Sequence, residues 1–151
     1  MTTTQQGREV STLELVRELL IAASPEHTFE SIIEELNSGG EMPDGKPLQL
    51  KIEPWPGGRL FRDLGNNAGH LWAHVQVIKP PTLLELWGPM MMSYPSVNFV
   101  QYRVTPEGRK SRLKILHQAM GLIRDEHRTG MAEGWGDALS RIREVAEEKA
   151  R

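Results

Sequence analysis

Short segments in which apolar and polar residues alternate occupy the middle of the chain, from Pro47 to Ala119. The segments are LQLKIE, RLFRD, HLWAHVQVI, TLLELW, VNFVQYRV and SRLKILHQA. Turn-forming residues separate them at positions 56–58, 65–67, 80–81 and 105–108. A period of two puts alternate side chains on opposite faces of a strand, and strands roughly 8 to 12 residues apart predict an antiparallel meander.

The end of the chain changes to helical spacing. Between about Asp125 and Lys149 the apolar residues are three or four positions apart, at Met131, Trp135, Ala138, Leu139, Ile142, Val145 and Ala146. This pattern predicts a long amphipathic helix with one covered face. Gly134 and Gly136 flank Trp135 although glycine costs about 1 kcal/mol in a helix. We expect them to permit a close approach of the helix to the sheet.

A second helix is predicted near the N-terminus. Ser24, Pro25 and Glu26 form a typical helix start, with a capping hydroxyl, a proline at the first helical position and an acid in the first turn. The helix is expected to run from Pro25 to Leu36 and to end in the polar, glycine-rich run 37–40.

The residues before this helix are harder to assign. Residues 1–7 are polar and are expected to form a disordered tail, which leaves residues 8–151 as a single domain. The segment Ser11–Ala23 fits both a helix, which its local pattern slightly favours, and a strand.

Composition excludes several classes of protein. The chain has 151 residues, and 18 Lys and Arg against 20 Asp and Glu leave a net charge of −2. Nucleic acid is therefore not expected as a partner, because phosphate binding needs a basic face. The absence of cysteine excludes disulfides, thiolate zinc sites and a cysteine nucleophile. No stretch approaches the roughly 18 apolar residues that cross a bilayer, and no signal peptide is evident, so a cytoplasmic protein without membrane contact is expected.

Strand parity predicts which side chains face the helix. An antiparallel sheet that packs against one helix buries its more apolar face. Parity places inside Leu71, Ala73, Val75, Val77, Leu84, Leu86, Asn98, Val100, Tyr102, Val104, Leu113, Ile115 and His117. The same parity puts His70, Trp72, His74 and Trp87 on the outer face.

Three members of the inner set are polar: Asn98, Tyr102 and His117. A buried polar group that lacks a hydrogen bond costs about 1 to 3 kcal/mol, so each needs a partner. Two interpretations stay open: a satisfied structural network, or contacts to a ligand in a concave, mostly apolar site. A third assigns proton transfer to Tyr102 or His117, because an imidazole titrates near neutral pH.

Several stretches carry a family resemblance: VRELLIAASPEHTFESI, GHLWAHVQVIKPPTLLELWG, YRVTPEG with SRLKILHQAMG, and EGWGDALSRI. In order and spacing they resemble the activator of heat-shock-protein-90 ATPase homologue-like family, within the START and birch-pollen-allergen-like SRPBCC superfamily. The resemblance implies an α+β helix-grip fold, in which a curved antiparallel sheet wraps around the long C-terminal helix. It also implies that Leu13–Ala22 is the first strand, that a helix lies between strands 1 and 2, and that sheet and C-terminal helix enclose an apolar cavity.

The expected function is to bind or carry a small hydrophobic or amphipathic molecule in that cavity. The predicted contacts are Asn98, Tyr102, His117, Trp135, Leu71, Val75, Leu86, Val100, Leu113 and Leu139. No catalytic residue, metal or cofactor is assigned. His70 and His74 share one face of a strand about 7 Å apart, and no third metal ligand can be identified.

Two other functions compete with ligand binding. The first is a protein-interaction module related to chaperone activation, which would use Trp55, Trp72 and Trp87 on the outer face to bind a partner or a second copy. The second is an enzyme of the polyketide cyclase/dehydratase type, which the superfamily also contains. The loop Met90–Met92 is expected either to form a flexible lip of the cavity or to pack over one end of the sheet.

Overall fold

The computed structural model describes residues 9–151, and the tail expected for residues 1–7 lies outside them. Within this range seven strands form one antiparallel sheet in the order β1-β7-β6-β5-β4-β3-β2. The strands are β1 (Ser11–Ile21), β2 (Leu50–Ile52), β3 (Arg59–Gly65), β4 (Ala68–Lys79), β5 (Leu83–Gly88), β6 (Ser96–Glu107) and β7 (Lys110–Gly121). The helices are α1 (Pro25–Glu34), the π-helical turn η1 (Glu35–Gly39) and α2 (Asp125–Lys149).

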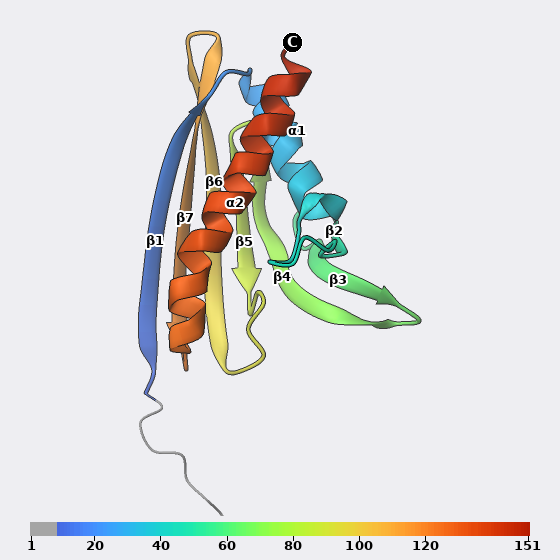
Figure 1. The fold of residues 1–151 in the computed structure, drawn as a ribbon, viewed down its shortest axis with the longest axis vertical. Helices are drawn as coiled ribbons and strands as arrows, with labels where there is room; N and C mark the ends of the chain where they lie inside the picture. The colour runs from blue at the N-terminus through green and yellow to red at the C-terminus, as the bar shows by residue number, and fades with distance from the viewer. Residues whose placement is uncertain (1–8) are drawn as a thin grey trace, which may run out of the picture.

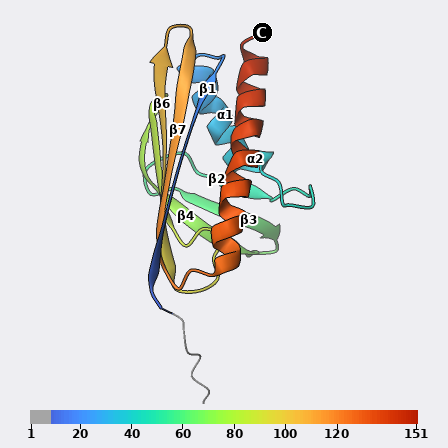
Figure 2. The same ribbon diagram turned by 60° about the vertical axis from the view of Figure 1, so that its left-hand side comes forward.

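Both long helices lie on one face of the sheet, and the other face carries no helix (Figures 1 and 2). In Figure 1, α2 crosses the sheet diagonally beside α1, while the β3–β4 hairpin projects away from the helices. The α+β prediction and the position of α1 between strands 1 and 2 are confirmed. A site between the sheet and α2 would therefore be lined by the side chains on this helical face.

β1 resolves the ambiguity of the segment Ser11–Ala23. It pairs with β7 along its whole length, from Ser11 opposite Gly121 to Ile21 opposite Ser111. Leu15 and Ile21 are buried against the helices. The pairing satisfies the main chain along one edge of β1, a non-local gain that outweighs the slight local preference for helix.

The sequence signals around α1 are confirmed with one difference at its end. The Ser24 hydroxyl accepts a hydrogen bond from the His27 N–H at 3.2 Å, and Pro25 opens the helix. The α-helix stops at Glu34, two residues before the predicted end, and continues as the π-helical turn η1. Its helical geometry breaks at Asn37 and Ser38, where the φ of Ser38, 79°, is left-handed, and the turn ends at Gly39.

Two β-bulges overturn part of the parity assignment in β4. Leu60 pairs with Ala73 and Phe61 with Leu71, so Trp72 has no opposite residue on β3. A bulge of this kind turns the strand by one residue, so side chains beyond it change face. Leu71 is 43% exposed and Trp72 is buried, which makes the predictions of an inward Leu71 and an outward Trp72 wrong.

The second bulge lies between Val75 and Val77, which pair with Leu86 and Glu85. Beyond it Ile78 packs against the core, whereas Val77 pairs with the outward Glu85. The inward assignment of Val77 is therefore wrong for the same reason. In β6 and β7, where no bulge interrupts the register, the predicted inner residues from Asn98 to Val104 and from Leu113 to His117 are all buried.

The bounds predicted for α2 are confirmed, but the role expected of its glycines is wrong. A Cβ built at Gly134 or Gly136 would meet no atom within 4 Å. These glycines therefore face open space and do not permit a close approach. Such approaches occur at Gly88, where a Cβ would lie 2.4 Å from the Trp72 carbonyl oxygen, and at Gly121, where it would lie 2.4 Å from that of Pro95.

Candidate functional site

A chain of hydrogen bonds joins α2 to the inner face of the sheet. The indole N–H of Trp135 donates to Nδ1 of His117 at 3.0 Å. On the other side of the same ring, Nε2 of His117 lies 2.7 Å from Oδ1 of Asn98. His117 and Asn98 are completely buried. The structure thus brings together three of the four predicted polar and aromatic site residues.

The donors and acceptors of this chain determine the protonation state of His117. An indole nitrogen can only donate, so Nδ1 of His117 must be the unprotonated acceptor. The proton of the neutral ring then sits on Nε2 and is donated to the Asn98 oxygen. Burial lowers the pKa of His117 to about 4, which agrees with a neutral ring. Both ring nitrogens are occupied, so His117 offers no free position to a ligand or a substrate proton.

Asn98 anchors this chain to the loop that follows β5. Its side-chain N–H₂ donates to the carbonyl oxygens of Gly88 at 3.2 Å and Pro89 at 3.1 Å. It also lies 3.7 Å from the sulfur of Met92. Met90 and Met92 are buried, while Met91 is exposed. Of the two expectations for this loop, the structure therefore favours the packed one.

Tyr102 is the exception among the predicted polar residues. It is buried on the inner face of β6, and its ring lies 5.7 Å from the ring of Trp135 in an edge-on arrangement. Burial, with a smaller contribution from the carboxylate of Glu35, raises the pKa of Tyr102 well above its usual value. The phenol is therefore a neutral donor. Within residues 9–151 its hydroxyl forms no hydrogen bond, and it is not one of the fully buried unpaired atoms.

Trp72 supplies a buried donor without a partner. The bulge in β4 turns its side chain into the core that also contains Tyr102 and Val100. Its indole nitrogen is the one buried side-chain nitrogen or oxygen among the described residues that has no hydrogen-bond partner. Sequence reasoning missed Trp72 as an inner residue, because alternation alone carries no signal for the position of a bulge.

A partly buried ion pair lies between η1 and α2. The guanidinium of Arg141 donates to both carboxylate oxygens of Glu35, with Nη2 at 2.9 Å from Oε2 and Nε at 3.0 Å from Oε1. Desolvation raises the pKa of Glu35 even though Arg141 opposes the shift. Neither residue was singled out from the sequence. The pair is electrically neutral as a unit.

The apolar residues predicted to shape the site divide into two groups. Five of them are buried in one core cluster, namely Val75, Leu86, Val100, Leu113 and Leu139. Trp135 is half-buried against this cluster. Leu71 lies on the opposite face and cannot contribute. Whether these side chains touch a ligand stays a prediction.

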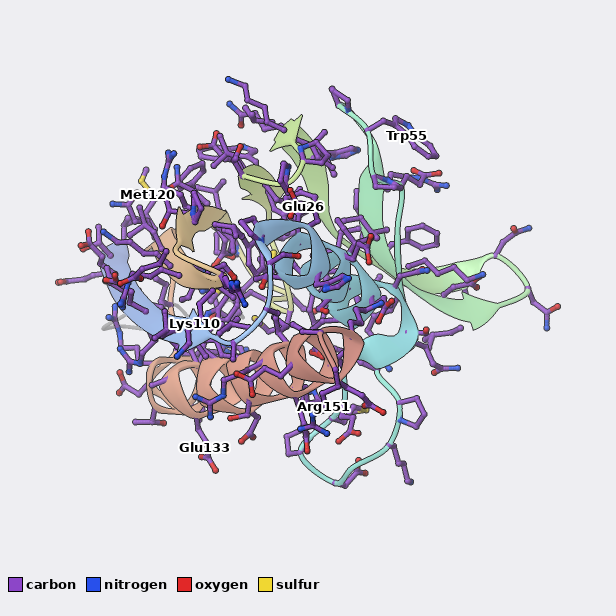
Figure 3. All side chains as sticks on the ribbon, turned by 90° about the horizontal axis from the view of Figure 1, so that it is seen from above. Glu26, Trp55, Lys110, Met120, Glu133 and Arg151 are labelled. Atoms are coloured by element: carbon purple, nitrogen blue, oxygen red, sulfur yellow. The ribbon has the colours of Figure 1, made fainter. Side chains whose placement is uncertain are left out.

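A separate hollow lies on the outer face of the sheet, away from α2. Its volume is about 420 Å³, and it is lined by Thr12, Leu13, Glu14, Trp87, Val97, Phe99, Gln118, Ala119 and Met120. Trp87 is 49% exposed, as its predicted outer position requires. Figure 3 shows Met120 on the side of the sheet that faces away from α2. The sequence indicated the outer position of Trp87 but gave no sign of this hollow.

The remaining histidines have other surroundings. His74 is exposed, whereas His70 is half-buried and packs edge-on to Trp72 with ring centres 6.4 Å apart. In residues 9–151 no group of three His, Cys, Asp or Glu side chains is placed to hold a metal ion. His127 at the start of α2 binds the Tyr94 hydroxyl through Nδ1 at 2.6 Å.

No helix in the described range is long and apolar enough to cross a bilayer.

Comparison with known proteins yields a fold and no family. No family model matches the chain, and no curated protein matches its sequence. Solved structures do match. A protein of unknown function from Staphylococcus aureus superposes with a TM-score of 0.70 at 12% identity, over 93% of this chain and 97% of the other. An uncharacterised protein from Rhizobium leguminosarum gives 0.69 at 16% identity over the same shares.

Another matching structure has a title that names a function. It is the di-domain ARO/CYC StfQ from the steffimycin biosynthetic pathway, with a TM-score of 0.65 and 14% identity. The match covers 92% of this chain and 52% of that chain. At this level of identity the likeness establishes the helix-grip fold alone, because one fold serves many functions.

Proposed function

We propose that this protein binds a small apolar or amphipathic molecule on the helical face of its sheet, between the sheet and α2. The observation that carries the proposal is the buried indole N–H of Trp72, which has no hydrogen-bond partner among the described residues. The Tyr102 hydroxyl on the same face also forms no hydrogen bond with them, but it is not fully enclosed. Buried polar groups are almost always paired, and an unpaired one costs about 1 to 3 kcal/mol. A bound molecule that accepts a hydrogen bond would remove this cost.

The proposal gives the predicted residues different roles. Val75, Leu86, Val100, Leu113 and Leu139 would form the apolar wall. Trp135, His117 and Asn98 would hold that wall in place, because their hydrogen bonds are used within the protein. Tyr102 would contact the molecule directly. One neighbouring structure is titled a di-domain ARO/CYC from a biosynthetic pathway, which is in line with the proposal.

Nile red, an uncharged dye that fluoresces in apolar surroundings, tests this function. We expect saturable binding to the wild type, weaker binding to Tyr102→Phe and unchanged binding to Trp87→Gln. The second variant is a matched control, because Trp87 lines the hollow on the outer face. Loss of binding in Trp87→Gln alone would move the site to that hollow. Native and denaturing mass spectra of the purified protein would also reveal a co-purified molecule.

A second candidate function is protein interaction through the outer face. The hollow with Trp87, Val97, Phe99 and Met120 supports it, because an exposed apolar patch is typical of a contact surface. The occupant would be a second copy or a partner protein, in line with the resemblance to the chaperone-activator family. Sedimentation of the wild type and of Trp87→Gln tests self-association. A wild type that stays monomeric at high concentration would remove the second copy as an occupant.

Enzymatic function has less support from the geometry. His117 has both ring nitrogens engaged and titrates near pH 4, so it is a poor general acid or base at neutral pH. Tyr102 is a neutral phenol whose raised pKa makes it a hydrogen-bond donor and a weak acid. These properties suit orientation of a bound molecule better than proton transfer.

A further inference from the structure

The charges around the proposed site indicate which molecules it accepts. Among residues 9–151 the fully buried polar side chains are Thr28, Ser31, Asn98, Ser111 and His117. None carries a charge, because the hydrogen bonds of His117 require its neutral form. An anion placed among them would therefore meet no buried cation. Burying an unpaired charge costs far more than burying a neutral polar group.

Three partly buried arginines form contacts within the protein. Arg141 forms a two-pronged pair with Glu35, whose negative charge cancels its own. Arg62 on β3 donates to the carbonyl oxygen of Leu48, and Arg128 on α2 donates to that of Thr12. The charge of Arg141 is therefore already neutralised by Glu35 and is not available to a carboxylate ligand. A neutral ligand needs no such cation.

The two unpartnered groups are both donors. The indole of Trp72 can only donate, and the phenol of Tyr102 keeps its proton at neutral pH. Trp72 and Tyr102 lie at different positions along the strand direction of the sheet. Trp72 contacts Gly88, which pairs with Asn98, and Tyr102 follows Asn98 by four residues along β6. At 3.3 to 3.4 Å per residue, Asn98 and Tyr102 lie about 13 Å apart along the strand.

We propose that the site selects uncharged molecules that carry hydrogen-bond acceptors, such as ketones or esters on an apolar skeleton, and discriminates against carboxylates of the same size. Tyr102 and Trp72 are the donors that bind these acceptors. This inference rests on the proposed function, since it specifies the chemistry of the same site. It assigns to Trp72 a role that its predicted outer position would exclude.

A matched pair of probes tests the selection. 2-Acetylnaphthalene is neutral, whereas 2-naphthoate has nearly the same shape and is an anion at pH 8. We expect calorimetry at pH 8 to show that the ketone binds at least about tenfold more tightly than the carboxylate. Equal or tighter binding of 2-naphthoate would overturn the selection and leave ligand binding intact. Binding of neither probe nor of Nile red would overturn the proposed function as well.

Two variants test the donors. Tyr102→Phe and Trp72→Phe each remove one donor and keep an aromatic ring. The ketone has one acceptor and the two donors lie about 13 Å apart along the sheet. We therefore expect one variant to weaken its binding by about fivefold to tenfold, a typical value for one hydrogen bond, and the other to leave it unchanged. Naphthalene, which has no acceptor, serves as the control ligand and should bind the variants and the wild type equally. An equal loss for the ketone and naphthalene would show a packing effect and overturn the donor role. Thermal melts check that each variant is folded.

Discussion

Trp135 of α2 donates its indole N–H to Nδ1 of His117 on β7, across 3.0 Å. This bond fixes one tautomer of a completely buried histidine and fastens the long helix to the centre of the sheet. The Nε2–H of His117 donates a hydrogen bond to Oδ1 of Asn98. The side-chain N–H₂ of Asn98 in turn donates to the carbonyl oxygen of Gly88 at the start of the loop after β5. The helix, the sheet and that loop are therefore joined by a single polar chain through the core.

The tautomer of His117 is directly observable. Because Trp135 can only donate, the proton of His117 is expected on Nε2 at neutral pH. Long-range ¹H–¹⁵N NMR spectra should show an unprotonated Nδ1 and a protonated Nε2. In Trp135→Phe, which leaves Nδ1 without a donor, we expect the ring to become heterogeneous and stability to fall by about 1 to 3 kcal/mol. A protonated Nδ1 in the wild type would contradict this network.

The stability of the protein should depend on pH through His117. Its pKa is about 4 when folded and 6.5 as a free side chain, so the unfolded chain binds a proton first as the pH falls. The stabilisation is complete above pH 6.5 and is lost on acidification toward pH 4, amounting to about 3 kcal/mol. Urea unfolding of the wild type and His117→Gln measures this difference. Parallel pH profiles of the two proteins would contradict it.

Gly134 and Gly136, on either side of Trp135, lower the stability of α2 because glycine has a low helix propensity. Neither Gly134 nor Gly136 has a neighbour that a methyl group would strike. Alanine at either position should therefore stabilise the protein by about 0.5 to 1 kcal/mol. Gly88→Ala is the contrasting variant, because its Cβ would press on the Trp72 carbonyl. Chemical denaturation should show gains for the first two variants and a loss for the third.

The bulge in β4 has a measurable consequence for the two sides of the strand. Leu71 is exposed, whereas Val75 is buried. Leu71→Ser should change stability by no more than about 0.5 kcal/mol, while Val75→Ala should cost about 2 kcal/mol. Thermal unfolding of the pair tests the assignment. A large loss of stability in Leu71→Ser would contradict the bulge and support the regular strand that simple alternation predicts.

Side chains protect the β1 edge of the sheet, which is one of its two edges. Arg128 donates to the Thr12 carbonyl, Arg17 donates to that of Val16, and Glu147 accepts from the Ala22 N–H. These contacts occupy main-chain groups that could pair with another strand. The double variant Arg128→Ala/Glu147→Ala should therefore self-associate more than the wild type in sedimentation experiments. Arg143→Ala, on the exposed side of α2, is the control.

Much of the fold could be predicted from local patterns in the sequence. The bounds of α2, the cap at Ser24 and the inner faces of β6 and β7 depend on residues a few positions apart, and each was predicted correctly. The inward position of Asn98, Tyr102 and His117 belongs to this group. Alternation determines the face of a side chain wherever the strand is regular.

Contacts between distant segments decided the rest. β1 is a strand because β7 pairs with it, although its own pattern slightly favours a helix. The bulge at Trp72 arises from the pairing of β3 with β4, and it reversed the faces of Leu71 and Trp72. The sequence determined that His117 is buried, but only the tertiary structure supplied Trp135 and Asn98 as its partners and left Tyr102 and Trp72 without any. A hydrogen bond needs two groups at one place, and their meeting is a property of the folded chain.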